Sequence, residues 1–422
     1  MTVLPPQTDT LIRNARLVLP DAVTGPGSLR IRNGRIDRFR VGPAEPPRAG
    51  DCTLIDGNNQ LVLPGIIDLH TDALEKEIMP RPRADFPLEV AAQELENKLM
   101  ACGVTTVFHS LHQGYQSAEK NAGSRYTRTE IFNRIDAWAR AHSLIHTRIH
   151  LRFEVTGLYA LEEVYDRMRR GQIALLSIMD HTPGQGQYPV REVYQRFERD
   201  GKSRAEADRY IAEEQARPRL DEAGLEQLVE TAHGLGIKVA SHDDDTPDKV
   251  RAIHALGIDV SEFPITPEAA KAALDHGMHT IGGASNVLRG GSLTGNLDVS
   301  RAIAGGLITG LCSDYYPPSI LHAQFKLVRS GVCSLEEASR LVSGGPAEAV
   351  GLGERTGRIE PGLAADLMLV ANQNGLPKVT HTLADGRLVH QSAHQPRRPF
   401  DPVDQLLQRQ AEPEDAHRAV LA

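Results

Sequence analysis

The sequence predicts an α/β protein, a distorted (β/α)8 TIM barrel with a small β-sandwich domain built from both termini. Apolar runs that suit buried strands alternate with helix-like sequence about eight times along the chain. Several of these runs end in His, Asp or Glu, as expected where parallel strands meet at one mouth. The 422 residues also exceed the roughly 250 residues of one barrel, so we expect a second domain.

The first barrel strand is expected at residues 62–69, directly before His70 and Asp72. Alternate residues of a strand project from the same face, so these two side chains should converge on one point. Later strands end in Glu154, in Asp180-His181, in His242 and in Asp314, and another carries Glu262. Their expected ranges are 104–109, 148–154, 173–180, 237–242, 258–263, 279–284 and 307–314.

Helix signals fill the intervals between these strands. Thr246-Pro247 and Thr266-Pro267 each place a capping hydroxyl before a proline at the first helical position. Ser334 and Glu337 have the spacing of a capping box. Apolar residues at helical spacing between 190 and 197 predict a further helix. Because residues 189–236 exceed what a barrel connection needs, we expect extra helices inserted before the His242 strand.

Both ends of the chain predict β-structure. The first ~60 residues and residues 362–390 alternate apolar and polar positions around the hairpin signals Asn33-Gly34, Asp56-Gly57 and Asp385-Gly386. We therefore assign residues 1–62 and 357–392 to the two parts of one β-sandwich domain. Residues 63–356 form the barrel, and residues 393–422 form a poorly packed tail.

Composition excludes several classes of protein. The net charge of -8, without a clustered basic stripe, argues against nucleic-acid binding. No apolar run approaches the ~18 residues of a membrane span, and no secretory signal is visible. The four cysteines are far apart and suit reduced residues, not a disulfide framework. We expect a cytoplasmic protein and leave a homo-oligomer open.

Imidazole and carboxylate groups that converge at strand ends suit a divalent metal such as zinc. A lone histidine at a strand end is more often a hydrogen-bonded structural residue. Five ligand-type strand ends in one barrel pattern reverse that expectation. Two alternatives stay open: Asp180 is a rival of His181, and Glu154 could pair with Arg152 or another arginine. His109 and His112 are read as loop or core residues and are left out of the site.

Motifs spread from residue 60 to residue 320 resemble those of the amidohydrolase superfamily of metal-dependent hydrolases. Within that superfamily they are similar to the PhnM-type diphosphatases of bacterial phosphonate degradation. The motifs are Pro64-Gly-Ile-Ile-Asp-Leu-His-Thr-Asp72, Pro80-Arg-Pro-Arg83, Met179-Asp-His-Thr-Pro-Gly-Gln185, Ser241-His-Asp-Asp244, Glu262-Phe-Pro264, Gly283-Ala-Ser-Asn-Val-Leu-Arg-Gly-Gly-Ser292 and Ser313-Asp-Tyr-Tyr-Pro317.

The resemblance implies hydrolysis of α-D-ribose 1-methylphosphonate 5-triphosphate to the 5-phosphate and pyrophosphate, after attack of water on the α-phosphorus. It implies two divalent metal ions per chain, with zinc favoured and manganese or iron as alternatives. His70, Asp72 and Asp314 would hold one ion, and Asp314 would accept the proton of the attacking water. His181 and His242 would hold the other ion, with Glu154 bridging the two.

A phosphorylated sugar phosphonate also needs cationic and amide donors. Arg81 and Arg83 follow the first strand closely enough for a loop to fold over the barrel mouth. Arg289 and Ser292 belong to a glycine-rich loop near the seventh strand, where barrels often bind phosphate. We predict that these four residues bind the substrate phosphates. Alternative functions are hydrolysis of a cyclic amide or N-acyl substrate, and a non-catalytic subunit of a larger assembly.

Overall fold

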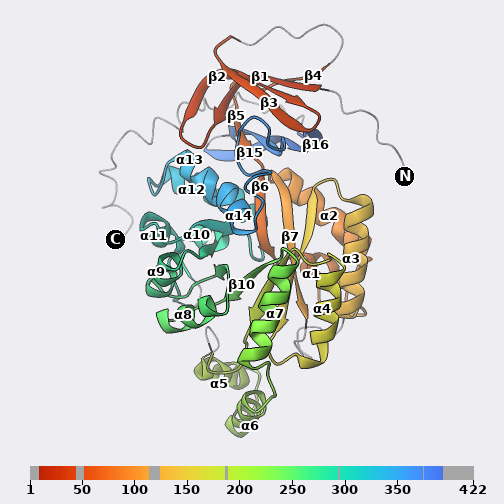
Figure 1. The fold of residues 1–422 in the computed structure, drawn as a ribbon, viewed down its shortest axis with the longest axis vertical. Coiled ribbons are helices and arrows are strands. Elements are labelled where there is room, and N and C mark those ends of the chain that lie inside the picture. The colour runs from red at the N-terminus through yellow and green to blue at the C-terminus, as the bar shows by residue number, and fades with distance from the viewer. Residues whose placement is uncertain are drawn as a thin grey trace.

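The computed structural model describes residues 9–43, 52–113, 124–185, 189–292, 295–373 and 375–392. Within these ranges, eight parallel strands form a nearly closed barrel, which confirms the predicted fold (Figure 1). Backbone hydrogen bonds join the last strand to the first, from Asp314 N to His70 O (2.9 Å) and from Asp72 N to Asp314 O (2.7 Å). The strands are β6 (Ile66–Thr71), β7 (Val104–Gln113), β8 (His146–Glu154), β9 (Leu175–Met179), β10 (Lys238–His242), β11 (Val260–Glu262), β12 (His279–Gly283) and β13 (Gly310–Cys312).

Helices follow the barrel strands, and the predicted caps are present. Thr246 and Thr266 accept hydrogen bonds from the third residue of their helices, and Ser334 and Glu337 form the capping box. The helices are α1 (Ala73–Ile78), α2 (Leu88–Ala101), α3 (Arg128–His142), α4 (Leu161–Arg169), α7 (Glu222–Gly234), α8 (Pro247–Ala255), α9 (Pro267–Asp275), α10 (Ala284–Arg289), α11 (Val299–Ala304), α12 (Pro318–Arg329), α13 (Leu335–Val342) and α14 (Gly344–Ala349), with a 3-10 turn at Leu158–Ala160.

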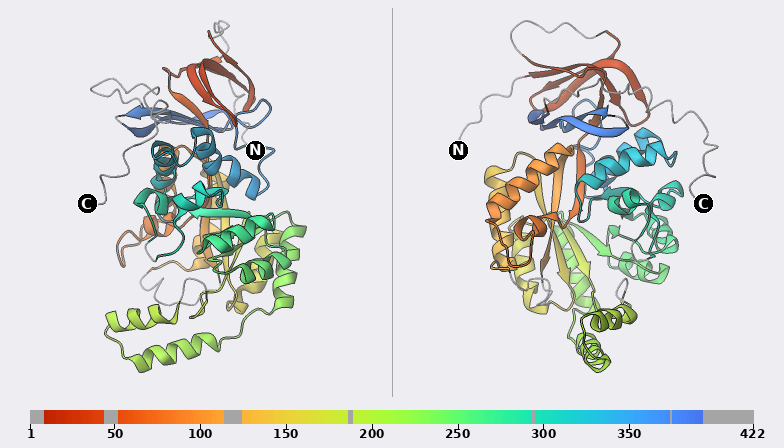
Figure 2. Two further views of the ribbon diagram at one scale, coloured as in Figure 1. Left: turned by 90° about the vertical axis from the view of Figure 1, so that its left-hand side faces the viewer. Right: turned by 180° about the vertical axis from the view of Figure 1, so that it is seen from behind.

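The insertion between β9 and β10 is helical, as predicted. Besides α7, it contains α5 (Val190–Arg199) and α6 (Arg204–Gln215). These two helices project from the end of the molecule opposite to the second sheet (Figures 1 and 2). They share a small apolar cluster of their own, formed by Val193, Phe197, Ala207 and Ile211.

The second sheet combines strands from both ends of the chain (Figure 2). Its strands are β1 (Asp9–Val18), β2 (Val23–Arg32), β3 (Arg35–Val41), β4 (Cys52–Asp56), β5 (Leu61–Pro64), β14 (Leu367–Gln373), β15 (Leu376–Ala384) and β16 (Arg387–Gln391). The antiparallel pair of β5 and β14 joins the N-terminal strands to the C-terminal ones. The domain limits drawn from the sequence stay a prediction, and the tail at 393–422 lies outside the described residues.

Two of the three hairpin signals are confirmed. Asn33-Gly34 links β2 to β3 and Asp385-Gly386 links β15 to β16, each with two residues at positive φ. The hairpin predicted at Asp56-Gly57 is wrong, because β4 and β5 both run parallel to β1. The left-handed residues there are Asn58 and Asn59, which carry the chain along β1 without reversing it.

The strand predicted at residues 62–69 is in fact two strands. β5 belongs to the second sheet and β6 to the barrel, and Gly65 lies between them. A Cβ atom at Gly65 would lie only 2.2 Å from the Thr105 side chain, so this crossing between the two sheets needs a glycine. The apolar run is continuous through residues 61–69 because both strands are buried, and it therefore hides the boundary.

Apolar side chains fill the barrel and cover its outside. An inner cluster includes Leu69, Phe108, Val260 and Ile281, and a larger cluster lies between the strands and the helices. The barrel is therefore a packed core with its polar residues at one end. The described residues contain no helix long and apolar enough to cross a membrane. All four cysteines are unbridged.

Candidate active site

One group of candidate metal ligands lies where the barrel closes. His70 ends β6, Asp72 precedes α1, and Asp314 follows β13. One ligand atom from each lies within 4.8 Å of the others, and His70 Nε2 is 3.6 Å from Asp72 Oδ1. Asp314 has a positive φ of 64°, an uncommon conformation for a residue with a side chain. The hydrogen bonds that close the barrel hold this backbone in place.

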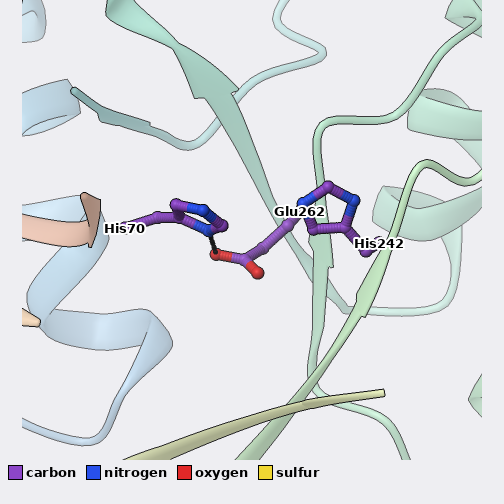
Figure 3. A group of neighbouring side chains, drawn as sticks. All are labelled: His70, His242 and Glu262. Carbon is purple, nitrogen blue, oxygen red and sulfur yellow. Dashed lines mark hydrogen bonds and ion pairs between the residues drawn. The ribbon is translucent and has the colours of Figure 1, made fainter. Parts of the chain in front are cut away.

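A second group shares His70 and adds His242 and Glu262. Figure 3 shows the Glu262 carboxylate between the two rings, with its hydrogen bond to His70 Nδ1 (3.3 Å). The ring centroids of His70 and His242 are 5.7 Å apart. Sequence reasoning noted Glu262 inside a strand but did not assign it to the site. The available signal was its position as the last residue of β11.

Glu154 and His181 contact each other. His181 Nδ1 pairs with Glu154 Oε2, and His181 N donates to Glu154 Oε1 (2.9 Å). Its rival Asp180 binds Arg219 at the loop surface instead. Neither Glu154 nor His181 belongs to a group of three ligand atoms within 4.8 Å among the described residues. That Glu154 and His181 bind a metal ion together with His242 stays a prediction.

Arg152 is a buried cation at the centre of the site. Its Nη1 lies 3.2 and 3.3 Å from the two Asp72 carboxylate oxygens and 2.9 Å from His112 Nε2. The expected alternative, a pair between Arg152 and Glu154, stays a prediction. Burial alone would raise the pKa of Asp72, but the charge of Arg152 and the hydrogen bond with His70 hold it well below its usual range.

Further polar residues lie behind the ligands. His150 on β8 and Ser177 on β9 are completely buried, and Ser177 Oγ donates to Glu262 Oε2 (2.7 Å). Burial lowers the pKa of His150 to about 3, so its ring is neutral. Sequence reasoning missed both residues. The signal in the sequence was the alternation of His150, Arg152 and Glu154 in β8, which places all three on one face.

The donor set fits a divalent metal ion. Both ring nitrogens of His242 are buried without a hydrogen bond among the described residues, although Nδ1 lies 2.7 Å from Asp243 Oδ2. Burial also lowers the pKa of His181, which keeps a lone pair on its ring. Mixed imidazole and carboxylate donors suit zinc, manganese or iron. A buried Nε2 of His242 without a hydrogen-bond partner in the described part of the chain, beside His70, is what we expect of a metal ligand.

A cavity of about 340 Å³ extends from these residues toward the loop after β12. His70, Asp72, His242 and Asp314 line one part of it. Arg289 and Ser292 line another part, so the structure brings these two predicted phosphate-binding residues to the site. Phe263, Leu297, Val299 and Ile308 add an apolar wall. Arg81 and Arg83 are exposed in the α1–α2 loop and are not among the lining residues.

Comparison with known proteins shows the family to which the chain belongs. The family model described as "Amidohydrolase family" matches residues 190–389. The chain is 35% identical over 386 residues to the alpha-D-ribose 1-methylphosphonate 5-triphosphate diphosphatase of Escherichia coli (strain K12), covering 90% of this chain and 100% of that protein. The chain belongs to the amidohydrolase family. It is therefore a hydrolytic enzyme, and amidohydrolases typically bind divalent metal ions.

Solved amidohydrolase structures have the same fold at low sequence identity. A prolidase complexed with N-methylphosphonate-L-proline is 16% identical with a TM-score of 0.61, covering 91% of this chain and 100% of that one. A D-hydantoinase is 14% identical with a TM-score of 0.59, covering 91% of this chain and 95% of that one. Both likenesses concern the fold alone.

Proposed function

We propose that this amidohydrolase hydrolyses α-D-ribose 1-methylphosphonate 5-triphosphate to the 5-phosphate and pyrophosphate in phosphonate catabolism. The observation that carries the proposal is one cavity that joins the group His70, Asp72 and Asp314 to Arg289. The relative of 35% identity bears the name of this activity. A cation at one end and a set of metal-type ligands at the other suit a substrate with a chain of phosphates.

His70, Asp72 and Asp314 would hold one divalent ion, and His181 and His242 would hold a second, with Glu154 bridging the two. When bound, such ions stabilise charge on phosphoryl oxygens and lower the pKa of water. Arg289 would bind the terminal phosphates, because its exposed guanidinium at the cavity wall has no acidic partner among the described residues. Arg81 and Arg83 stay predicted phosphate contacts that would require their loop to approach the cavity.

Asp314 is the proposed acceptor of the water proton. Burial raises the pKa of its carboxyl group, and the nearby charge of Asp72 acts in the same direction. A raised pKa brings a carboxylate nearer to the pH at which a base works well. The water oxygen would bond to the α-phosphorus. The bond between this phosphorus and the oxygen that bridges the α- and β-phosphorus atoms would break. Pyrophosphate would leave, and the 5-phosphate would keep the new oxygen.

The test is 31P NMR of the metal-reconstituted protein with the triphosphate in 18O-labelled water. We expect pyrophosphate release, with 18O in the 5-phosphate and not in pyrophosphate. Asp314→Asn should lower kcat by at least about 100-fold. Asp275→Asn changes an exposed aspartate of α9 and should leave kcat unchanged. Intact triphosphate in the presence of bound metal, together with turnover of a dipeptide or a hydantoin, would contradict the proposal.

The role of Arg289 has its own test. Arg289→Ala removes a charge-assisted contact and should raise KM by roughly 10- to 100-fold, with a smaller effect on kcat. Arg301→Ala is the matched control, because Arg301 is an exposed arginine on neighbouring α11 and does not line the cavity. Equal KM values for the two variants would remove Arg289 from the phosphate site.

A further inference from the structure

Glu262 is a charged residue of the site that has no contact with its cavity. Its side chain is 0% exposed, and it is absent from the residues that line the cavity, although its neighbours His242 and Phe263 line it. It lies on β11, and its partner His70 lies on β6, which is not a neighbouring strand of the barrel. The carboxylate therefore reaches across the inside of the barrel toward His70 (Figure 3).

Both oxygens of Glu262 are occupied by side-chain contacts. Oε1 lies 3.3 Å from His70 Nδ1, and Oε2 accepts a hydrogen bond from Ser177 Oγ at 2.7 Å. Ser177 Oγ is in turn 2.6 Å from His150 Nε2. A carboxylate held in this way has little freedom to turn toward the cavity. We therefore expect Glu262 to act on a bound ligand through His70 and not by touching the ligand itself.

The contacts return to the strand on which they begin. His150 Nδ1 lies 3.0 Å from the carbonyl oxygen of Leu69, the residue before His70. The chain Leu69, His150, Ser177, Glu262 and His70 thus links β6, β8, β9 and β11 in a closed ring of contacts. These contacts meet the His70 ring on its Nδ1 side and reach the backbone of β6 one residue before it.

We propose that Glu262, anchored by Ser177, is a positioning residue that holds His70 with Nδ1 protonated and Nε2 directed toward Asp72 and Asp314. The neutral imidazole that binds a metal has one N–H proton, so a carboxylate that accepts this proton at Nδ1 leaves the lone pair on Nε2. Nε2 is the atom that lies 3.6 Å from Asp72 Oδ1. A carboxylate behind a ligating histidine also makes that ring a stronger donor.

Glu262 keeps both of its side-chain contacts in spite of complete burial. The inference concerns how His70 binds a metal ion, and it holds for any substrate. A failure of the diphosphatase assay would not affect the proposed role of Glu262, since the test of that role uses no substrate.

The test measures the affinity of the chelator-treated full chain for Zn²⁺, by competition with a chromophoric chelator. Glu262→Gln keeps the size of the side chain but removes its charge, and we expect Kd for Zn²⁺ to rise by about 10- to 100-fold. Ser177→Ala leaves the charge but removes its anchor, and Kd should rise by a smaller factor. Glu96→Gln is the control, because Glu96 is a buried, hydrogen-bonded glutamate on α2, outside the site.

A spectroscopic measurement separates positioning from a general structural effect. In protein labelled with 15N-histidine and loaded with Zn²⁺, the His70 shifts should report a metal on Nε2 and a proton on Nδ1. Glu262→Gln should weaken the low-field signal of the Nδ1 proton. Wild-type affinity in the Glu262 variant would overturn the proposal. Loss of one whole equivalent of Zn²⁺ would also overturn it, because Glu262 would then be a direct ligand. If Glu262→Gln does not fold, wild-type affinity in Ser177→Ala decides against the proposal.

Discussion

His109 on β7 is a buried histidine whose protonation opposes folding. Burial lowers its pKa to about 4, from 6.5 in the unfolded chain. Between these two values the unfolded state binds the extra proton, so stability falls as the pH decreases from 6.5 to 4. At 1.36 kcal/mol per unit, the loss from this residue is on the order of 3 kcal/mol.

We expect His109→Gln to flatten this pH dependence, because glutamine does not titrate. The free energy of unfolding in urea, measured at pH 7, 6 and 5, checks the prediction. His142→Gln, at an exposed histidine that ends α3, should keep the wild-type slope. A variant at position 109 that loses stability as steeply as the wild type would show that other groups cause the slope.

Other residues of the site differ in how far the sequence revealed them. His70 and Asp72 could be paired from their spacing alone, and Asp314 from the rule that parallel strands end at one mouth. Glu262 could not, because its contact with His70 joins residues 192 positions apart on strands that are not neighbours. Such contacts across a barrel depend on strand order and tilt, which leave no local spacing in a single sequence.

At the scale of elements, the junction between β5 and β6 depends on Gly65. Gly65→Ala would bring a Cβ atom to 2.2 Å from Thr105 Oγ1 and 2.3 Å from Thr105 Cγ2, so Thr105 or the strand must shift. Overpacking of this kind should lower the free energy of unfolding by about 1–3 kcal/mol, measured in urea. Thr105→Ala in the same chain should recover part of the loss, since it removes both nearest atoms.

A matched glycine gives the control for this prediction. Gly234 at the end of α7 has no atom within 4 Å of an added Cβ and does not have positive φ. Gly234→Ala should therefore leave stability unchanged or raise it slightly. If Gly65→Ala behaves in the same way, or if Thr105→Ala gives no recovery, steric conflict at the junction is not what selects glycine there.

Elements with a local chemical signal could be predicted, and those set by partner strands could not. The caps at Thr246, Thr266 and Ser334 depend on hydrogen bonds within four residues, so their helices follow from the sequence. Asp56-Gly57 has the composition of a hairpin, yet the strands on either side both pair with β1. Competition for a strand edge decided that case, and turn propensity did not.

For the whole molecule, the barrel and the second sheet meet around Asp366. Its backbone oxygen accepts from Gly65 N (2.8 Å), its Oδ2 from Thr356 Oγ1 (2.9 Å), and its Oδ1 from Asp385 N (2.7 Å). His146 at the start of β8 lies 3.4 Å from the same carboxylate. The alternation of strands and helices predicted the barrel, but nothing in that alternation shows which buried group joins the two sheets.

Asp366→Ala should therefore destabilise both sheets together. It leaves the Asp385 amide and the Thr356 hydroxyl without their acceptor, which costs roughly 1–3 kcal/mol each, so we expect a loss of about 2–6 kcal/mol. Trp138, the only tryptophan, lies on α3 beside the barrel, so its fluorescence follows the barrel while circular dichroism follows the whole chain. The urea transitions followed by fluorescence and by circular dichroism should both move to lower urea concentration by the same amount.

The control is Asp275→Ala, which removes an exposed ion pair with Lys271 on α9 and should cost less than about 1 kcal/mol. An unmoved Trp138 transition in Asp366→Ala would mean that the barrel does not depend on this contact with the second sheet.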